Sequence, residues 1–344
     1  MMQNEILDCI YEVYIEDMKE KLHAARYVAV EVDDTTDVTC KSQFAIILRY
    51  VENCAPVERF FKFVEVHDRT GSGLAQVILD ELAPYDLQNK LIAQSYDGST
   101  VMSGDTGVQT IFQSRQTTGI GLKNAIISDF ISAIVRVRGN LSLNMEKEEA
   151  VGKRRRITTP FEDACEVCDI LTTQLPDWLE RSDLHLALSV VDPKQFKKLR
   201  TIPSTKIDTI VQNYPDINRH FLETEIEVLY SNESFQSEHT STVTKLFTFL
   251  NQSELTGEFQ EVGKVLEILL ATPVHTAEPE RSFSTLKRIK SFARNATSQD
   301  KLNALAVLSV YKDIITKDPQ FNEKVISKFA LQENRRAQFM YKDA

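Results

Sequence analysis

The chain has 344 residues, of which 42% are hydrophobic and 26% charged, a balance typical of globular proteins that bury a core. Its 40 basic and 50 acidic side chains give a formal net charge of −10, which argues against a protein that coats nucleic acid along its whole length. The longest apolar runs, at 44–48 and 265–270, are far shorter than the roughly 20 residues of a membrane span, and no signal peptide is visible. We therefore expect a cytosolic or nuclear protein that does not enter a membrane.

The first hundred residues predict a mixed sheet covered by helices. Apolar periodicity indicates helices over 3–25, 74–82 and 105–112, and β-rich runs indicate strands over 27–33, 42–51, 57–66 and 90–96. The second and third strands are joined by a short turn, so we expect them to form an antiparallel hairpin. This order of elements is typical of an α/β domain.

The rest of the chain changes character. Residues 113–159 lose the pattern and end in the basic run KRRR at 153–156. Beyond Pro160 the spacing predicts helices over 161–175, 193–199, 205–212, 216–230, 240–250, 259–270, 279–293 and 299–315. The C-terminal half is therefore expected to be largely helical.

The cysteines do not predict a disulfide framework. The five, at positions 9, 40, 54, 165 and 168, are an odd number without framework spacing, which favours reduced thiols. Cys165 and Cys168 form a lone CxxC motif, and zinc would require further soft ligands. We expect this pair to be buried on a helix, with redox or metal roles as the alternatives.

Two aspartates stand at the ends of predicted strands. Asp33 ends the first strand, in DDTTD, and Asp97 ends the fourth, in YDG. If these strands are neighbours, the two carboxylates lie close together and need a cation or a proton, and hard oxygen ligands suit Mg²⁺ or Mn²⁺. The alternative is that both residues are turn formers or helix caps.

A third acid opens a predicted helix near the C-terminus. Pro279 suits a first helical turn, and Glu280 then shares a face with Phe283 and Lys287. Arg281 points elsewhere, where it could meet a phosphate or a carboxylate. The alternative is an acidic first turn that complements the helix dipole.

Two long segments resemble hAT-family transposases. The C-terminal one contains PVHTAEPERSFSTLKRIKS at 273–291 and QDKLNALAVLSV at 299–310, and it resembles the family's dimerisation region. The N-terminal one contains VEVDDTTDVTCKSQFAIILRYV at 30–51, and it resembles the first part of the ribonuclease H-like catalytic domain. The resemblance covers residues 25–112 and 150–315 and is strongest to MYM-type zinc-finger-like proteins derived from these transposases.

The resemblance implies an acidic triad. In this family two aspartates and a glutamate hold two divalent ions, Mg²⁺ or Mn²⁺, for DNA cleavage and strand joining. They correspond here to Asp33, Asp97 and Glu280, so all three acids are present.

The chain also departs from the family pattern. Nothing over 113–145 matches the family's strand with a C-x-x-H pattern, and the large helical insertion and the N-terminal zinc finger are missing. The only tryptophan, Trp178, does not match the one that assists DNA hairpin formation. Loss of the fifth strand would leave a sheet edge unpaired unless a segment such as 125–137 covers it. We therefore expect an incomplete ribonuclease H-like sheet with weakened DNA binding.

Basic residues remain as candidate nucleic-acid contacts. They are Arg281, Lys287, Arg288 and Lys290 on the predicted helix that carries Glu280, and Arg154 and Arg155 in the KRRR run. The alternative is that both groups are simply solvated. The KRRR run is also a candidate nuclear localisation signal, so we expect a nuclear protein, with the cytoplasm as the alternative.

The helices predicted at 262–270 and 302–315 are apolar almost all round, so other helices must enclose them. The resemblance implies a homodimer formed through this region, and the alternative is the core of a monomer. The expected organisation is an N-terminal helix (1–25), the first part of the ribonuclease H-like domain (26–115), a truncated insertion (116–160), a helical region (161–258), the dimerisation region (259–317) and a tail (318–344).

Three functions remain open. We expect a domesticated or decayed hAT-like protein that keeps the fold and self-association but not transposition. The alternatives are an active metal-dependent DNA nuclease or transposase and a chromatin-associated interaction module.

Overall fold

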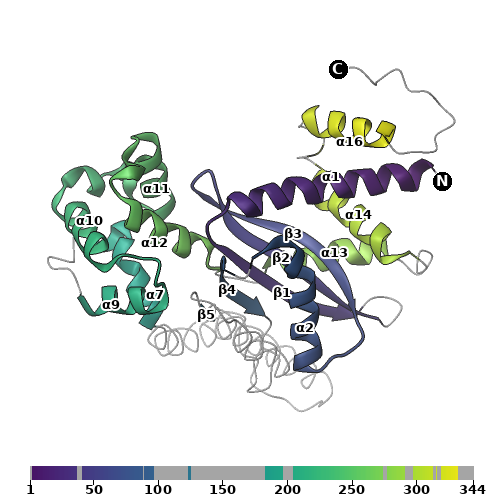
Figure 1. The fold of residues 1–344 in the computed structure, drawn as a ribbon, viewed down its shortest axis with the longest axis horizontal. Helices are drawn as coiled ribbons and strands as arrows, with labels where there is room; N and C mark the ends of the chain where they lie inside the picture. The colour runs from purple at the N-terminus through teal and green to yellow at the C-terminus, as the bar shows by residue number, and fades with distance from the viewer. Residues whose placement is uncertain are drawn as a thin grey trace, which may run out of the picture.

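The computed structural model describes residues 2–36, 41–87, 89–96, 123–124, 183–196, 204–273, 277–290, 297–312, 315 and 319–331. A mixed sheet lies beside a cluster of helices, and the first and last described helices, over residues 2–24 and 319–331, lie on the sheet side (Figure 1). The helices expected at 105–112 and 161–175, together with Cys165, Cys168 and Trp178, lie outside the described residues.

The sheet confirms the predicted α/β class. Its strands are β1 (Val28–Thr36), β2 (Ser42–Glu52), β3 (Ala55–Val66), β4 (Leu91–Tyr96) and β5 (Lys123–Asn124), in the spatial order β3-β2-β1-β4-β5. The β2–β3 pair is antiparallel, as expected for a hairpin, and β1 also pairs with β2 in the antiparallel direction. The β1–β4 and β4–β5 pairs are parallel.

A fifth strand lies beside β4. Lys123 and Asn124 pair with Ala93 and Gln94 of β4, which gives a strand of two residues within the described part of the chain. The expectation that the fifth strand is lost is therefore wrong, because this segment pairs with the β4 edge. The segment expected to cover that edge, 125–137, lies outside the described residues.

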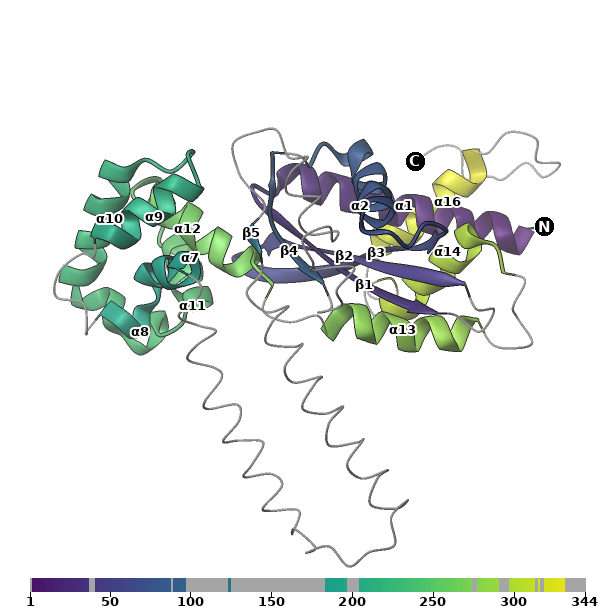
Figure 2. The ribbon, with the colours of Figure 1, turned by 90° about the horizontal axis from the view of Figure 1, so that it is seen from below.

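Helices cover both faces of the sheet. They are α1 (Met2–Ala24), α2 (Gly71–Leu82), α13 (Ala277–Ile289), α14 (Gln299–Val310) and α16 (Pro319–Leu331). Figure 2 shows α1 and α2 on one face and α13 on the other. The helix α16, which lies inside the segment expected as a tail, packs against α1, where Lys328 pairs with Glu16 and Glu12.

The remaining described helices build a second core. They are α7 (Asp183–Leu188), α8 (Pro193–Phe196), α9 (Ser204–Asn213), α10 (Arg219–Ser231), α11 (Val243–Gln252) and α12 (Gln260–Ala271). Their buried leucine, isoleucine and aromatic side chains form one cluster with Ala29, Ile92 and Ala93 of the sheet. Val28, Val30 and Val32 lie on β1, as Ala29 does, but pack in the other hydrophobic core. The sheet therefore contributes to both cores.

Helix α14 closes the β3 edge of the sheet with side chains. Asn303 accepts a hydrogen bond from the Phe63 backbone N–H (2.8 Å) and donates one to the Phe63 carbonyl (3.1 Å). Gln299 donates a second bond to the same carbonyl (2.7 Å). These amides take the place of a neighbouring strand, which blocks pairing of this edge with another chain.

Two tyrosines continue this closure. Tyr14 of α1 donates to the Phe60 carbonyl (2.6 Å), and the Tyr311 hydroxyl accepts from the Phe60 N–H. The two rings stack with centroids 5.2 Å apart. The register of β2 with β3 shifts between Ile46 and Ile47. A β-bulge therefore separates Phe60 and Phe63, the two β3 residues whose backbone groups these side chains satisfy.

The helical half is joined to the sheet by polar contacts. Arg49 of β2 pairs with Glu58 of β3 and donates from Nε to the carbonyl of Leu270 near the end of α12 (3.1 Å). Tyr27 donates to Asp216 (2.6 Å), a residue between α9 and α10. The two halves of the chain are therefore held together by buried and half-buried contacts.

Candidate functional site

The predicted acidic edge lies near the end of β1, but Asp33 does not end this strand as expected, because β1 stays paired with β2 as far as Thr36. Asp33 is half-buried, faces Ala45 of β2 in the register, and accepts a hydrogen bond from the Asp34 backbone N–H (2.9 Å). Strands β1 and β4 run parallel, with Val32 opposite Tyr96, so their carboxyl ends lie at the same edge. Asp97 follows Tyr96 directly but lies outside the described residues, so its approach to Asp33 stays a prediction.

The helix that carries the third acid packs on this sheet. Helix α13 lies against β1, β2 and β3, and Pro279, Ser282, Leu286 and Lys290 form its buried stripe. Pro279 stands in the first turn, as predicted. Glu280 belongs to this helix, but its side chain lies outside the described residues.

The described carboxylates do not by themselves make a metal site. No group of three or more His, Cys, Asp or Glu residues within the described ranges could hold a metal ion. Asp34, the acid next to Asp33, pairs with Arg69 (2.8 Å). Of the predicted triad the described side chains supply only Asp33, so we derive no catalytic step through a metal.

The sequence analysis missed a buried carboxyl group, Glu31. It lies on β1 two residues before Asp33, hence on the same face of the sheet, and it is 0% exposed. Neither carboxylate oxygen has a hydrogen-bond partner among the described residues. The pKa of Glu31 is raised to about 8, chiefly by burial and also by the nearby carboxylates of Glu58 and Glu278, against the lowering effect of Arg49 and Arg281. A glutamate inside the apolar run VAVEV was the available signal.

The basic residues of α13 do not form one exposed row. Arg281 is exposed but pairs with Glu278 one turn earlier, and Arg288 donates to the Thr285 hydroxyl (2.9 Å). Lys287 is exposed, whereas Lys290 is only 3% exposed because it shares the buried stripe. Arg154 and Arg155 lie outside the described residues.

Helix α14 belongs to the core of the single chain. Its side chains Leu302, Ala304, Ala306 and Val307 are buried against α1, α13 and β3. The prediction that this apolar helix must be enclosed is therefore satisfied within one chain. No described helix combines the length and the apolar character needed to cross a membrane.

Comparisons with known families match both ends of the chain. Residues 1–107 match the family described as ZMYM1/FAM200, RNase-like domain, and residues 228–314 match the hAT family C-terminal dimerisation region. The first match contains Asp33 and Asp97, and the second contains Glu280 and the helices α11 to α14. The two regions meet in space where α13 and α14 pack on the sheet.

Proposed function

We propose that this chain is a hAT-derived protein that acts as a self-associating scaffold without transposition activity, supported by its matches to an RNase-like domain over 1–107 and to the hAT C-terminal dimerisation region over 228–314. The observation that carries this proposal concerns the basic residues on and just after α13, the helix that packs on the sheet beside the acidic edge. Arg281 pairs with Glu278 and Lys290 is buried, which leaves Lys287 and Arg288 as the exposed cations of this set, fewer than the phosphate contacts that firm DNA binding needs. The net charge of −10 agrees with this.

A nuclease assay tests the absence of catalysis. We expect no cleavage of labelled DNA in Mn²⁺ above the level given by the Asp97→Ala variant. The same comparison in Mg²⁺ is expected to give the same result. Cleavage by the parent chain that disappears in Asp97→Ala and in Asp33→Ala would contradict the proposal.

The alternative is a metal-dependent DNA nuclease that uses Asp33, Asp97 and Glu280. It is favoured by the parallel pairing of β1 with β4 and by the packing of α13 on β1. In that case the carboxylates would hold Mg²⁺ or Mn²⁺, which polarise a phosphate and activate water.

We also propose which surface mediates self-association. Of the described residues in the matched dimerisation region, Val228 is the one large hydrophobic side chain that is exposed, at 43%. Phe221 lies two turns earlier on α10 and is also exposed. Since α12 and α14 are buried within the chain, we propose that the α10 face carrying these two residues contacts a second copy.

Light scattering tests this surface. We expect the parent chain to be a dimer at micromolar concentration and the double variant Phe221→Glu/Val228→Glu to be a monomer, because charges at the centre of an apolar contact oppose association. Ile326→Glu, at an equally exposed position on α16, is the matched control and should leave the dimer intact. A monomeric parent, or dissociation by Ile326→Glu alone, would contradict the assignment.

A further inference from the structure

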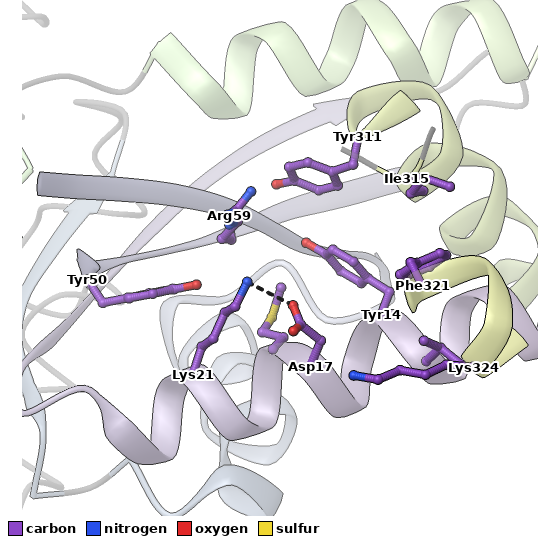
Figure 3. A pocket seen from close by; sticks show the side chains of 11 residues that line it. Tyr14, Asp17, Lys21, Tyr50, Arg59, Tyr311, Ile315, Phe321 and Lys324 are labelled. Atoms are coloured by element: carbon purple, nitrogen blue, oxygen red, sulfur yellow. Dashed lines mark ion pairs between the residues drawn. The ribbon is translucent and has the colours of Figure 1, made fainter. Parts of the chain in front are cut away.

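A cavity of about 80 Å³ lies beside α1, and its lining contains no residue of the acidic edge. It is enclosed by α1, by the strands β2 and β3, and by the segment that follows α14 (Figure 3). Neither the proposed scaffold function nor the acidic triad uses it. A volume of this size is several times that required by one water molecule.

One wall of the cavity carries a hydroxyl group without a partner. Tyr50 of β2 is only 1% exposed, and no acceptor among the described residues takes the proton of its hydroxyl. Burial raises the pKa of Tyr50, while the Arg59 guanidinium beside the hydroxyl oxygen lowers it. Figure 3 shows this hydroxyl pointing toward Lys21 and Arg59. A buried polar group normally has a partner, so this one indicates a position for a ligand atom.

The cavity has more positive than negative charge. Its lining contains Arg59, Lys21 and Lys324, against a single carboxylate, Asp17, which pairs with Lys21 at 3.0 Å. Just outside the lining, Glu52 lies 3.4 Å from both Lys21 and Arg59. The guanidinium of Arg59 has a long contact to Glu52 (3.4 Å) and lies 5.5 Å from the Tyr311 ring centroid. It therefore retains N–H donors for an acceptor inside the cavity.

The remaining walls are aromatic and apolar. The stacked rings of Tyr14 and Tyr311 are held in place by the Phe60 backbone, and Met18 and Phe321 close the other side. Walls of this kind exclude water and strengthen charge-assisted hydrogen bonds to an anion.

We propose that this cavity binds a phosphate group, held by the Tyr50 hydroxyl and the Arg59 guanidinium and balanced by Lys324 at its rim. A phosphate matches the cavity in size and offers acceptor oxygens to several donors at once. Arg59 supplies planar paired donors, which suit a phosphate better than a halide. The site would couple anion binding to the docking of α16 on α1.

Isothermal titration with inorganic phosphate tests the site on the full chain, at an ionic strength held constant with KCl. We expect saturable binding that Tyr50→Phe weakens by about tenfold or more, because the variant keeps the ring and removes one hydrogen bond to a charged group. Lys62→Met is the matched control, since Lys62 lies on β3 with Arg59 but pairs with Glu81 outside the cavity. Glycerol 3-phosphate in a parallel titration distinguishes free phosphate from an ester.

The proposal is overturned by three results. The first is no binding of either phosphate compound at 10 mM, on the order of the weakest specific affinities. The second is unchanged binding in Tyr50→Phe. The third is an equal weakening of phosphate binding in Lys62→Met, which would indicate general attraction between phosphate and positive charge rather than a defined site.

Discussion

Replacement of Arg49 with methionine is expected to lower the free energy of unfolding by about 3–5 kcal/mol, the range for breaking a buried ion pair from one side. Arg49 is buried between β2 and α12, where it pairs with Glu58 and donates to the Leu270 carbonyl. The variant leaves the Glu58 carboxylate without its cation. It also removes the nearest positive charge that lowers the pKa of Glu31, so a second buried carboxyl group becomes costlier to ionise.

Urea unfolding followed by circular dichroism measures this effect. The double variant Arg49→Met/Glu58→Leu should recover much of the lost stability, because it removes both charges together. Lys41→Met is the matched control, since Lys41 pairs with Glu65 on the surface, and its cost should stay below about 1 kcal/mol. If Arg49→Met lowered the free energy of unfolding no more than Lys41→Met does, the contact between β2 and α12 would contribute little to stability.

The sequence predicted the elements well because their signals are local. Runs rich in β-forming residues located β2 and β3, and the short turn between them correctly predicted an antiparallel hairpin. Helical periodicity located α1 and α9 to within about two residues, which is the usual scatter of helix ends.

The contacts that close the fold could not be predicted, because they join residues far apart in the chain. Asn303 and Phe63 are separated by 240 positions, and Arg49 and Leu270 by 221. An asparagine inside an apolar helix has no intrinsic preference for a strand edge. Only the packed structure shows that its amide replaces the missing neighbour of β3.

The candidate site was predictable in position but not in environment. The strand that carries Asp33 and the helix that carries Glu280 followed from local pattern, although the strand runs on to Thr36 beyond its predicted end at Asp33. The burial of Lys290 was also open to prediction, since Leu286 lies one turn earlier on the same stripe. The buried state of Glu31 depends on α13 covering the sheet, which no local pattern specifies.

Replacement of Asn303 with leucine is the second change with a large expected effect. Asn303 is buried, and its amide satisfies both the N–H and the carbonyl of Phe63. Leucine fills a similar volume but leaves the buried N–H without an acceptor, which costs about 1–3 kcal/mol. Loss of the second bond adds less, because Gln299 still donates to the carbonyl.

The matched control is Gln299→Ala, which removes a donor from the same carbonyl but leaves the Asn303 amide in place. We expect it to cost about 1 kcal/mol, since the Phe63 carbonyl keeps Asn303 as a donor and only the buried Gln43 amide oxygen loses its bond from Gln299. Amide hydrogen exchange gives an independent reading: the Phe63 N–H should exchange much faster in Asn303→Leu than in Gln299→Ala. Equal protection in both variants would mean that packing of α14, and not its amide, protects the edge of β3. In that case the edge would stay closed through the apolar contacts of Leu302, Ala306 and Val307 alone.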